Sequence, residues 1–176
     1  FLALSMGSAH AAVDKAAVVK TYADVALAEY EDALATAKRL QETVGVLVSK
    51  PSAETLRAAR HAWLDARVPY QQTEAFRFGN PIVDAWEGRV NAWPLDEGMI
   101  DYVDASYGTD SDANAYYVVN VIANHSISVG GKAVDTSVID AGLLGEVLHE
   151  ADGNEANVAT GYHAIEFLLW GQDLNG

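Results

Sequence analysis

Apolar side chains recur at steps of three and four residues between residues 14 and 48 of this chain. The spacing places them on one face of an α-helix, with Glu and Lys side chains between them. A Ser-Lys-Pro-Ser stretch at residues 49–52 interrupts the pattern, and a second helical pattern follows over residues 53–76. Because a short connection places two long helices side by side, the sequence predicts an all-α fold, an up-down helical bundle with long antiparallel helices.

Local signals refine this prediction. Ser52 is a good N-cap for the second helix, because its hydroxyl can accept a hydrogen bond from a free amide of the first turn. Pro69 lacks an amide hydrogen, so we expect a kink there. Residues 78–109 contain scattered Trp and Pro and are expected to form short helices and ordered loops. Asp110-Ser111-Asp112 is expected to cap a helix over residues 113–122.

A short apolar segment around residues 127–134 contains Gly130-Gly131 at its centre. Two glycines supply the positive φ angles of a two-residue turn, which predicts one small β-hairpin in the otherwise helical fold. A further helix, capped by Asp135 or Ser137, is expected to run to about His149.

The charge and the cysteine content exclude several functions. The chain carries 25 Asp and Glu against 11 Lys and Arg, a formal charge of −14. An acidic surface repels phosphate groups, so nucleic acids and anionic membrane surfaces are poor partners, whereas cations are attracted. Solubility, or a salty habitat, is the simpler explanation of the same charge. There are no cysteines, so any metal site must use imidazole and oxygen ligands.

Residues 1–11 form a short apolar run that ends in Ala9-His10-Ala11. This small-x-small pattern is typical of a signal-peptidase site, and we interpret residues 1–11 as a signal-peptide remnant with cleavage before Ala12. An ordinary apolar helix start is the alternative. No later stretch approaches the roughly 18 apolar residues of a membrane helix. We therefore expect a soluble protein that is exported from the cytoplasm.

The last predicted helix, over residues 156–170, places His163 and Glu166 three positions apart in an almost wholly apolar run. On an α-helix both side chains project from one face and can reach one ion. A His and a Glu are costly to bury unless they pair with each other, with another group or with a metal. The spacing therefore predicts either a pair of metal ligands or a metal-free His–Glu hydrogen bond.

Glu146 and His149 repeat the spacing of three in the preceding helix. Two such pairs facing each other would resemble the Glu-x-x-His units of di-iron helical bundles. The other glutamates show no matching pattern, so we favour the alternative that this pair lies on a solvated helix end.

Trp63, Arg67, Tyr70 and Glu74 are spaced four, three and four and share one face of the second helix. They are expected to be core residues with an internal Arg67–Glu74 ion pair. Alternatively, Glu74 or Tyr70 supplies a further metal ligand while Arg67 orients a carboxylate. The chain lacks the His-Glu-x-x-His, phosphate-loop, Gly-x-Ser-x-Gly and dinucleotide-binding motifs.

Residues 157–173, read as Asn-Val-Ala-Thr-Gly-Tyr-His-Ala-Ile-Glu-Phe-Leu-Leu-Trp-Gly-Gln-Asp, closely resemble the signature of the imelysin family, whose hallmark is Gly-x-His-x-x-Glu. That family includes the insulin-cleaving metallopeptidase and the iron-regulated protein A group. Residues 63–74, 76–81 and 89–96 are similar to the iron-regulated branch. The resemblance implies that residues 12–176 form an imelysin-like helical domain, with Gly161, His163 and Glu166 as the motif.

The resemblance also implies a fold of two bundle-like halves with the motif helix at their junction. Family members are longer, so the chain is expected to correspond to their N-terminal half. Export to the periplasm or cell surface, and a link to iron supply, are implied as well.

We therefore expect an exported metal-binding protein of bacterial iron acquisition. His163 and Glu166 would bind a divalent metal ion (Fe or Zn), Glu74 would be a possible third ligand, and Arg67 and Tyr70 would support the site. Expected partners are the metal ion and other iron-uptake or cell-envelope proteins, with membrane association only through an anchor outside the sequence. The alternatives are a metallopeptidase that uses the same pair, and a metal-free structural or interaction domain.

Overall fold

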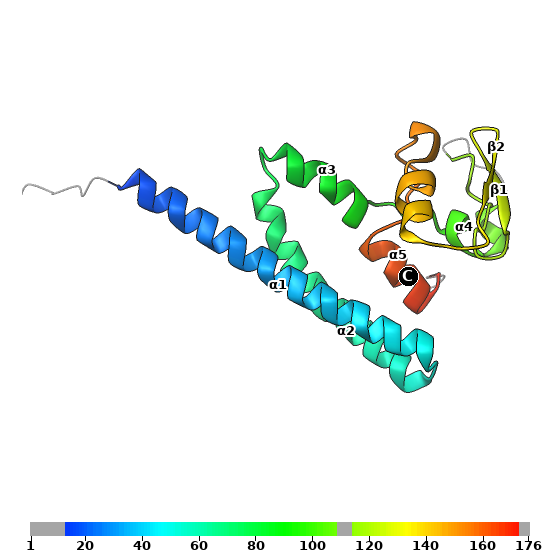
Figure 1. Ribbon diagram of the computed structural model, residues 1–176, viewed down its shortest axis with the longest axis horizontal. Helices are drawn as coiled ribbons and strands as arrows, with labels where there is room; N and C mark the ends of the chain where they lie inside the picture. The colour runs from blue at the N-terminus through cyan, green and yellow to red at the C-terminus, as the bar shows by residue number, and fades with distance from the viewer. Residues whose placement is uncertain (1–12, 109–113, 173–176) are drawn as a thin grey trace, which may run out of the picture.

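The computed structural model describes residues 13–108 and 114–172 (Figure 1). The segment interpreted as a signal-peptide remnant lies outside the described residues. The fold is mostly α-helical with one two-stranded hairpin, as predicted. Within the described residues, no helix is both long enough and apolar enough to span a lipid bilayer.

The two long helices form as the sequence predicts. Helix α1 (Lys15–Ser49) is capped by the carboxylate of Asp14, and α2 (Ala53–Gln72) is capped by Ser52. Ser52 and Thr55 cap each other's backbone amides in a capping box, which sets the start of α2. After the short turn, α2 runs back antiparallel along α1 (Figure 1).

The first core lies between α1, α2 and the last helix, α5 (Tyr162–Trp170). Ala59 and Ala66 are fully buried on α2, and their small side chains allow close approach of the neighbouring helices. Trp63 and Tyr70 fill the space toward α5, where Tyr162 and Leu169 complete the cluster. Packing against α2 therefore positions the helix that carries His163 and Glu166.

The chain leaves α2 through short elements. Helix α2 continues through Pro69 and tightens into a 3₁₀ turn, η1 (Thr73–Phe76). Helix α3 (Pro81–Val90) begins at a proline in its first turn, where the missing amide hydrogen has no cost, and Asn80 caps it. Helix α4 (Glu97–Ile100) and a 3₁₀ turn, η2 (Ala105–Tyr107), follow.

The predicted hairpin is present as β1 (Ser126–Val129) and β2 (Lys132–Asp135), paired antiparallel around the Gly130-Gly131 turn. It packs with α4 and with a π-helix, η3 (Leu143–Leu148), around a second core. A 3₁₀ turn, η4 (Ala151–Gly153), follows η3. The most deeply buried members of this second core are Met99, Leu148 and Val121.

The prediction of a helix over residues 113–122 is wrong for the described part of that range, because residues 114–122 form turns and irregular backbone. Asn120 adopts a positive φ of 47°, which interrupts a helix. The amides of Asn120 and Val121 donate to the carbonyls of Gly98 and Met99 instead of to carbonyls of their own segment. The proposed cap at residues 110–112 lies outside the described residues.

The next predicted helix begins later than expected. Asp135 belongs to β2, and its carboxylate accepts a hydrogen bond from the amide of Ser137. The helical segment begins only at residue 141, and the carboxylate of Asp140 accepts the amide of Leu143. Asp135 therefore stabilises a local turn after β2, and Asp140 caps the start of the helical segment.

The last helix is also shorter than predicted, since α5 begins at Tyr162 and not near residue 156. The backbone just before α5 forms hydrogen bonds with residues that are distant in the sequence. The carbonyl of Val158 accepts the amide of Asp96, and the carbonyl of Asn157 accepts the amide of Glu150. As a result, His163 lies in the first turn of α5.

Candidate metal-binding site

Gly161 starts the helix that carries the candidate site. Its φ of 92° lies in the region that side chains rarely adopt, and a Cβ there would lie 2.5 Å from the carbonyl oxygen of Val90. Only glycine allows α5 to begin this close to the end of α3. This explains physically why the Gly-x-His-x-x-Glu motif begins with glycine.

His163 and Glu166 lie one turn apart on α5 and contact each other. The His163 Nδ1 lies 3.0 Å from the Glu166 Oε2. The imidazole side chain is 18 % exposed and the carboxylate side chain 42 % exposed. The two side chains therefore share a face, as the spacing predicts, and stay reachable from solvent.

The pair lines a pocket of about 720 Å³. Trp93 forms one wall, with its ring centroid 4.7 Å from that of His163. Glu97 lines the same pocket and accepts a hydrogen bond of 3.1 Å from the side-chain amide of Gln172. The pocket is lined by Trp63, Leu64, Trp93, Leu95, Glu97, His163, Glu166, Phe167, Trp170, Gly171 and Gln172.

Glu97 and Trp93 were missed as site residues by the sequence analysis. They belong to no spacing pattern, because Trp93 lies in the connection between α3 and α4 and Glu97 is the first residue of α4. For Trp93 the only signal was the similarity of residues 89–96 to the iron-regulated branch of the imelysin family, and Glu97 lies just beyond that range. That similarity indicated the segment but not the direction of its side chains.

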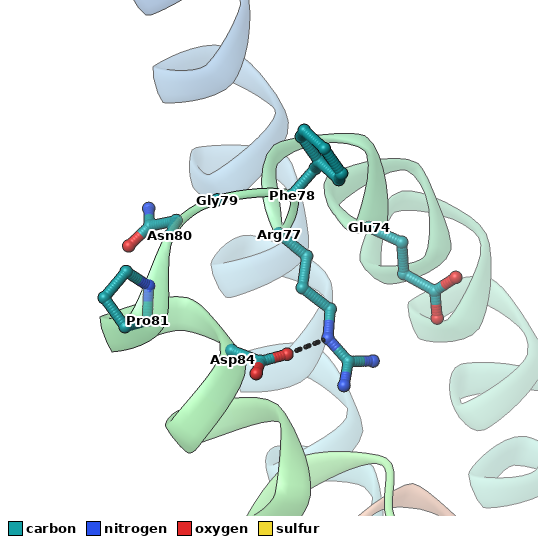
Figure 2. A pocket seen from close by; sticks show the side chains of 7 residues that line it. All are labelled: Glu74, Arg77, Phe78, Gly79, Asn80, Pro81 and Asp84. Atoms are coloured by element: carbon teal, nitrogen blue, oxygen red, sulfur yellow. Dashed lines mark hydrogen bonds and ion pairs between the residues drawn. The ribbon is translucent and has the colours of Figure 1, made fainter.

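Glu74 does not line the pocket of the pair, and Figure 2 shows it among the side chains of another pocket. It lines a separate pocket of about 590 Å³ around the connection from η1 to α3. In that pocket Arg77 donates a 2.6 Å hydrogen bond to Asp84. The structure thus does not place Glu74 in the pocket that His163 and Glu166 share.

Arg67 and Glu74 are connected through Asn91. Arg67 donates to the Asn91 Oδ1 at 2.5 Å, and the Asn91 Nδ2 donates to Glu74 at 3.4 Å. Among the residues that the structure describes, the predicted direct Arg67–Glu74 ion pair is absent. The guanidinium carbon of Arg67 lies 5.1 Å from the ring centroid of Tyr162, so Arg67 supports the start of α5 through a cation–π contact.

Tyr70 is a residue of the first core. Its side chain is buried, and its ring centroid lies 4.8 Å from that of Tyr162. Burial, followed by the charges of Glu87 and Glu74, raises the pKa of Tyr70. The phenol therefore stays protonated at neutral pH and is a poor metal ligand.

The side chains of the second pair, Glu146 and His149, lie in different environments. Glu146 is exposed, whereas the side chain of His149 is only 2 % exposed, so the expectation of a solvated helix end fails for the imidazole. The His149 Nδ1 lies 3.1 Å from the hydroxyl of Thr160, which in turn donates to the Arg89 carbonyl. Burial lowers the pKa of His149.

A di-iron centre finds no support in this arrangement. Across residues 13–108 and 114–172, no three His, Cys, Asp or Glu side chains converge closely enough to hold a metal ion. The candidate site therefore consists of two potential ligands, His163 and Glu166, in the wall of an open pocket.

Comparison with known proteins agrees with the motif. The family described as Imelysin matches residues 26–176, a range that includes α2, the hairpin and α5. Iron-regulated protein A of Synechococcus elongatus is 35 % identical over 72 residues, which cover 41 % of this chain and 20 % of that protein. The match thus spans about a fifth of the relative's length. Because the family match covers most of the chain and includes Gly161, His163 and Glu166, the chain belongs to the imelysin family.

Proposed function

We propose that this imelysin-family protein binds a divalent metal ion through His163 and Glu166 and takes part in bacterial iron acquisition. The observation that carries the proposal is the 3.0 Å contact between the His163 Nδ1 and the Glu166 Oε2 in the wall of an open pocket. The two atoms are close enough together for both to bind one ion. A purely structural pair would not need access to a pocket.

The donor set suits the proposed ion. An imidazole nitrogen and a carboxylate oxygen are ligands that iron, zinc and manganese accept. Iron is favoured because the relative is named an iron-regulated protein, and zinc is the alternative. The formal charge of −14 also draws cations toward the protein.

Two protein ligands leave several coordination positions for water or for groups from elsewhere. The other polar side chains of the pocket are already hydrogen-bonded: Glu97 accepts from the Gln172 side-chain amide, and the Gln172 amide oxygen accepts from the backbone amide of Asp104. Glu74, the third ligand expected from the sequence, would have to act from another pocket. We therefore assign binding to His163 and Glu166, and leave Glu74 a role in holding Asn91 and Arg67.

The cellular setting is part of the proposal. The apolar run of residues 1–11, with its small-x-small end, favours export to the periplasm or cell surface. Other iron-uptake or cell-envelope proteins are the expected partners there. The acidic surface argues against nucleic acid as a partner.

A metallopeptidase that uses the same pair is the second candidate. The pocket of about 720 Å³ favours it, because this volume can admit a peptide side chain as well as an ion. A catalytic zinc ion normally has three protein ligands and an activated water molecule. The pair supplies only two ligands, so we rank metal binding without catalysis first.

Metal analysis of the purified protein tests the proposal. We expect iron or zinc in near-stoichiometric amount in the wild type and strongly reduced metal in His163→Ala and Glu166→Gln. Glu146→Gln, an exposed acid of the same spacing pattern, is the matched control and should keep its metal. Equal metal content in the wild type and both pair variants would refute the proposal. Peptide cleavage that a chelator abolishes would favour the second candidate.

A further inference from the structure

The pocket beside His163 and Glu166 has features that a metal ion alone does not use. Three indole side chains line it: Trp63, Trp93 and Trp170. Two carboxylates, Glu97 and Glu166, line it as well. The described lining residues include no Lys or Arg, so His163 is the one basic side chain among them.

Indole faces carry negative electrostatic potential and attract cations. Two of the three indoles already have a cation nearby within the chain. The guanidinium carbon of Arg60 lies 5.3 Å from the ring centroid of Trp170, and that of Arg67 lies 5.7 Å from Trp63. In the described part of the chain no Lys or Arg lies over Trp93, which is 67 % exposed.

Glu97 is the carboxylate that lacks a cationic partner. Its Oε2 accepts a hydrogen bond from the neutral amide of Gln172. The ion pairs within the described residues do not include it. Glu166, in contrast, is engaged by His163. Trp93 and Glu97 thus offer an aromatic face and a negative charge in the same pocket.

The rest of the lining is apolar. Leu64, Leu95 and Phe167 contribute hydrocarbon surface to the pocket. A small inorganic cation cannot use such a surface, and a neutral apolar ligand would desolvate Glu97 and Glu166 without compensation. The side chains of Lys and Arg combine an apolar stem with a cationic end, which matches both parts of the lining.

We propose that this pocket binds a Lys or Arg side chain of a peptide or protein segment, with its charged end between Trp93 and Glu97 and its stem along the apolar wall. The inference goes beyond metal binding and does not require it, because Trp93 and Glu97 lie outside the His163–Glu166 pair. It identifies the partner of this pocket as a basic polypeptide.

Fluorescence anisotropy with a labelled pentapeptide, a central Lys flanked by glycines with blocked ends, tests the inference in the presence of chelator. The same peptide with acetyl-Lys keeps the stem but loses the charge. We expect the Lys and Arg peptides to bind about tenfold more tightly than the acetyl-Lys peptide, and to bind more weakly as salt increases. Equal binding of the Lys and acetyl-Lys peptides, or no binding of either, would overturn the inference.

Two variants locate the binding. Trp93→Ala and Glu97→Gln should each weaken binding of the Lys peptide by about three- to tenfold. The matched controls are the exposed residues Phe78 and Glu54, as Phe78→Ala and Glu54→Gln, which lie outside the pocket and should bind the peptide as the wild type does. Wild-type affinity in both pocket variants, or an equal loss in the controls, would overturn the inference.

Metal content, measured on the same samples, keeps the two proposals distinguishable. Trp93→Ala and Glu97→Gln should lose peptide affinity but keep bound metal. His163→Ala should lose metal and still discriminate between the Lys and acetyl-Lys peptides. A basic-peptide preference that disappears together with the metal in His163→Ala would contradict the assignment to Trp93 and Glu97.

Discussion

Two His–Glu pairs with the same spacing of three residues adopt different arrangements in this molecule. In α5, His163 and Glu166 lie on one face and contact each other. Near η3, Glu146 is exposed while His149 turns inward. The difference lies in the helix, because α5 is α-helical whereas Leu143–Leu148 is a π-helix that ends before His149.

In an α-helix, residues three apart are neighbours on the surface. The wider π-turn does not keep that relation, and His149 has extended backbone angles (φ −66°, ψ 125°). The same two residue types at the same spacing therefore produce a solvent-accessible ligand pair in one place and a buried structural histidine in the other.

Gly161 lies between the two histidines in sequence and should give the largest effect. In Gly161→Ala, the new Cβ would meet the Val90 carbonyl at 2.5 Å, at a φ of 92°. We expect the free energy of unfolding to fall by about 3 kcal/mol in urea titrations. Gly45→Ala is the matched control, because nothing lies within 4 Å of a Cβ at this position. Alanine in helix α1 should raise the free energy of unfolding by at most about 1 kcal/mol. A small loss in Gly161→Ala would show that α5 can shift away from α3 without cost.

Removal of the buried imidazole should give the next largest effect. His149→Ala creates a cavity and removes the contact with Thr160, so we expect a loss of about 2–3 kcal/mol in the free energy of unfolding. His163→Ala, at the more exposed pair, should cost about 1 kcal/mol or less. Equal losses in the two variants would erase the distinction between a structural and a functional histidine.

The pH dependence of stability should follow the buried histidine. Burial depresses the pKa of His149 below its ordinary value of 6.5, with the positive charge of Arg89 in the same direction and Glu150 opposing it. Between the depressed pKa and 6.5 the unfolded chain binds more protons than the folded chain, so stability falls as the pH falls through this window.

The slope is expected to reach up to about 1.4 kcal/mol per pH unit for this one group. Urea titrations of the wild type and His149→Asn between pH 7.5 and 5 measure it, since asparagine cannot titrate. His61→Gln, on the exposed face of α2, is the control and should keep the wild-type slope. A slope unchanged in His149→Asn would mean that other groups control the acid response.

The parts of the fold that could be predicted from the sequence depend on neighbours in the chain. Helices α1 and α2 follow from long periodic patterns and from the local cap at Ser52. The hairpin follows from Gly130-Gly131, which makes its own turn. These signals require only residues a few positions apart, so the sequence alone is enough to read them.

The parts that could not be predicted depend on distant backbone. The start of α5 is set by hydrogen bonds from Asp96 and Glu150 to the segment before it. The positions of Trp93 and Glu97 at one pocket depend on how the α3–α4 connection and the start of α4 pack, and no spacing encodes that. The His163–Glu166 pair was predictable because its geometry is internal to one helix turn.

The smallest expected change in stability carries the most information about the pair. In Glu166→Gln, the amide oxygen can still accept a hydrogen bond from the His163 Nδ1, and the side chain is 42 % exposed, so the free energy of unfolding should change by less than about 0.5 kcal/mol. Metal content should nevertheless fall, because an amide is a weaker metal ligand than a carboxylate. Paired urea titration and metal analysis check both expectations. A metal-free structural pair would give the same small change in stability with no change in bound metal.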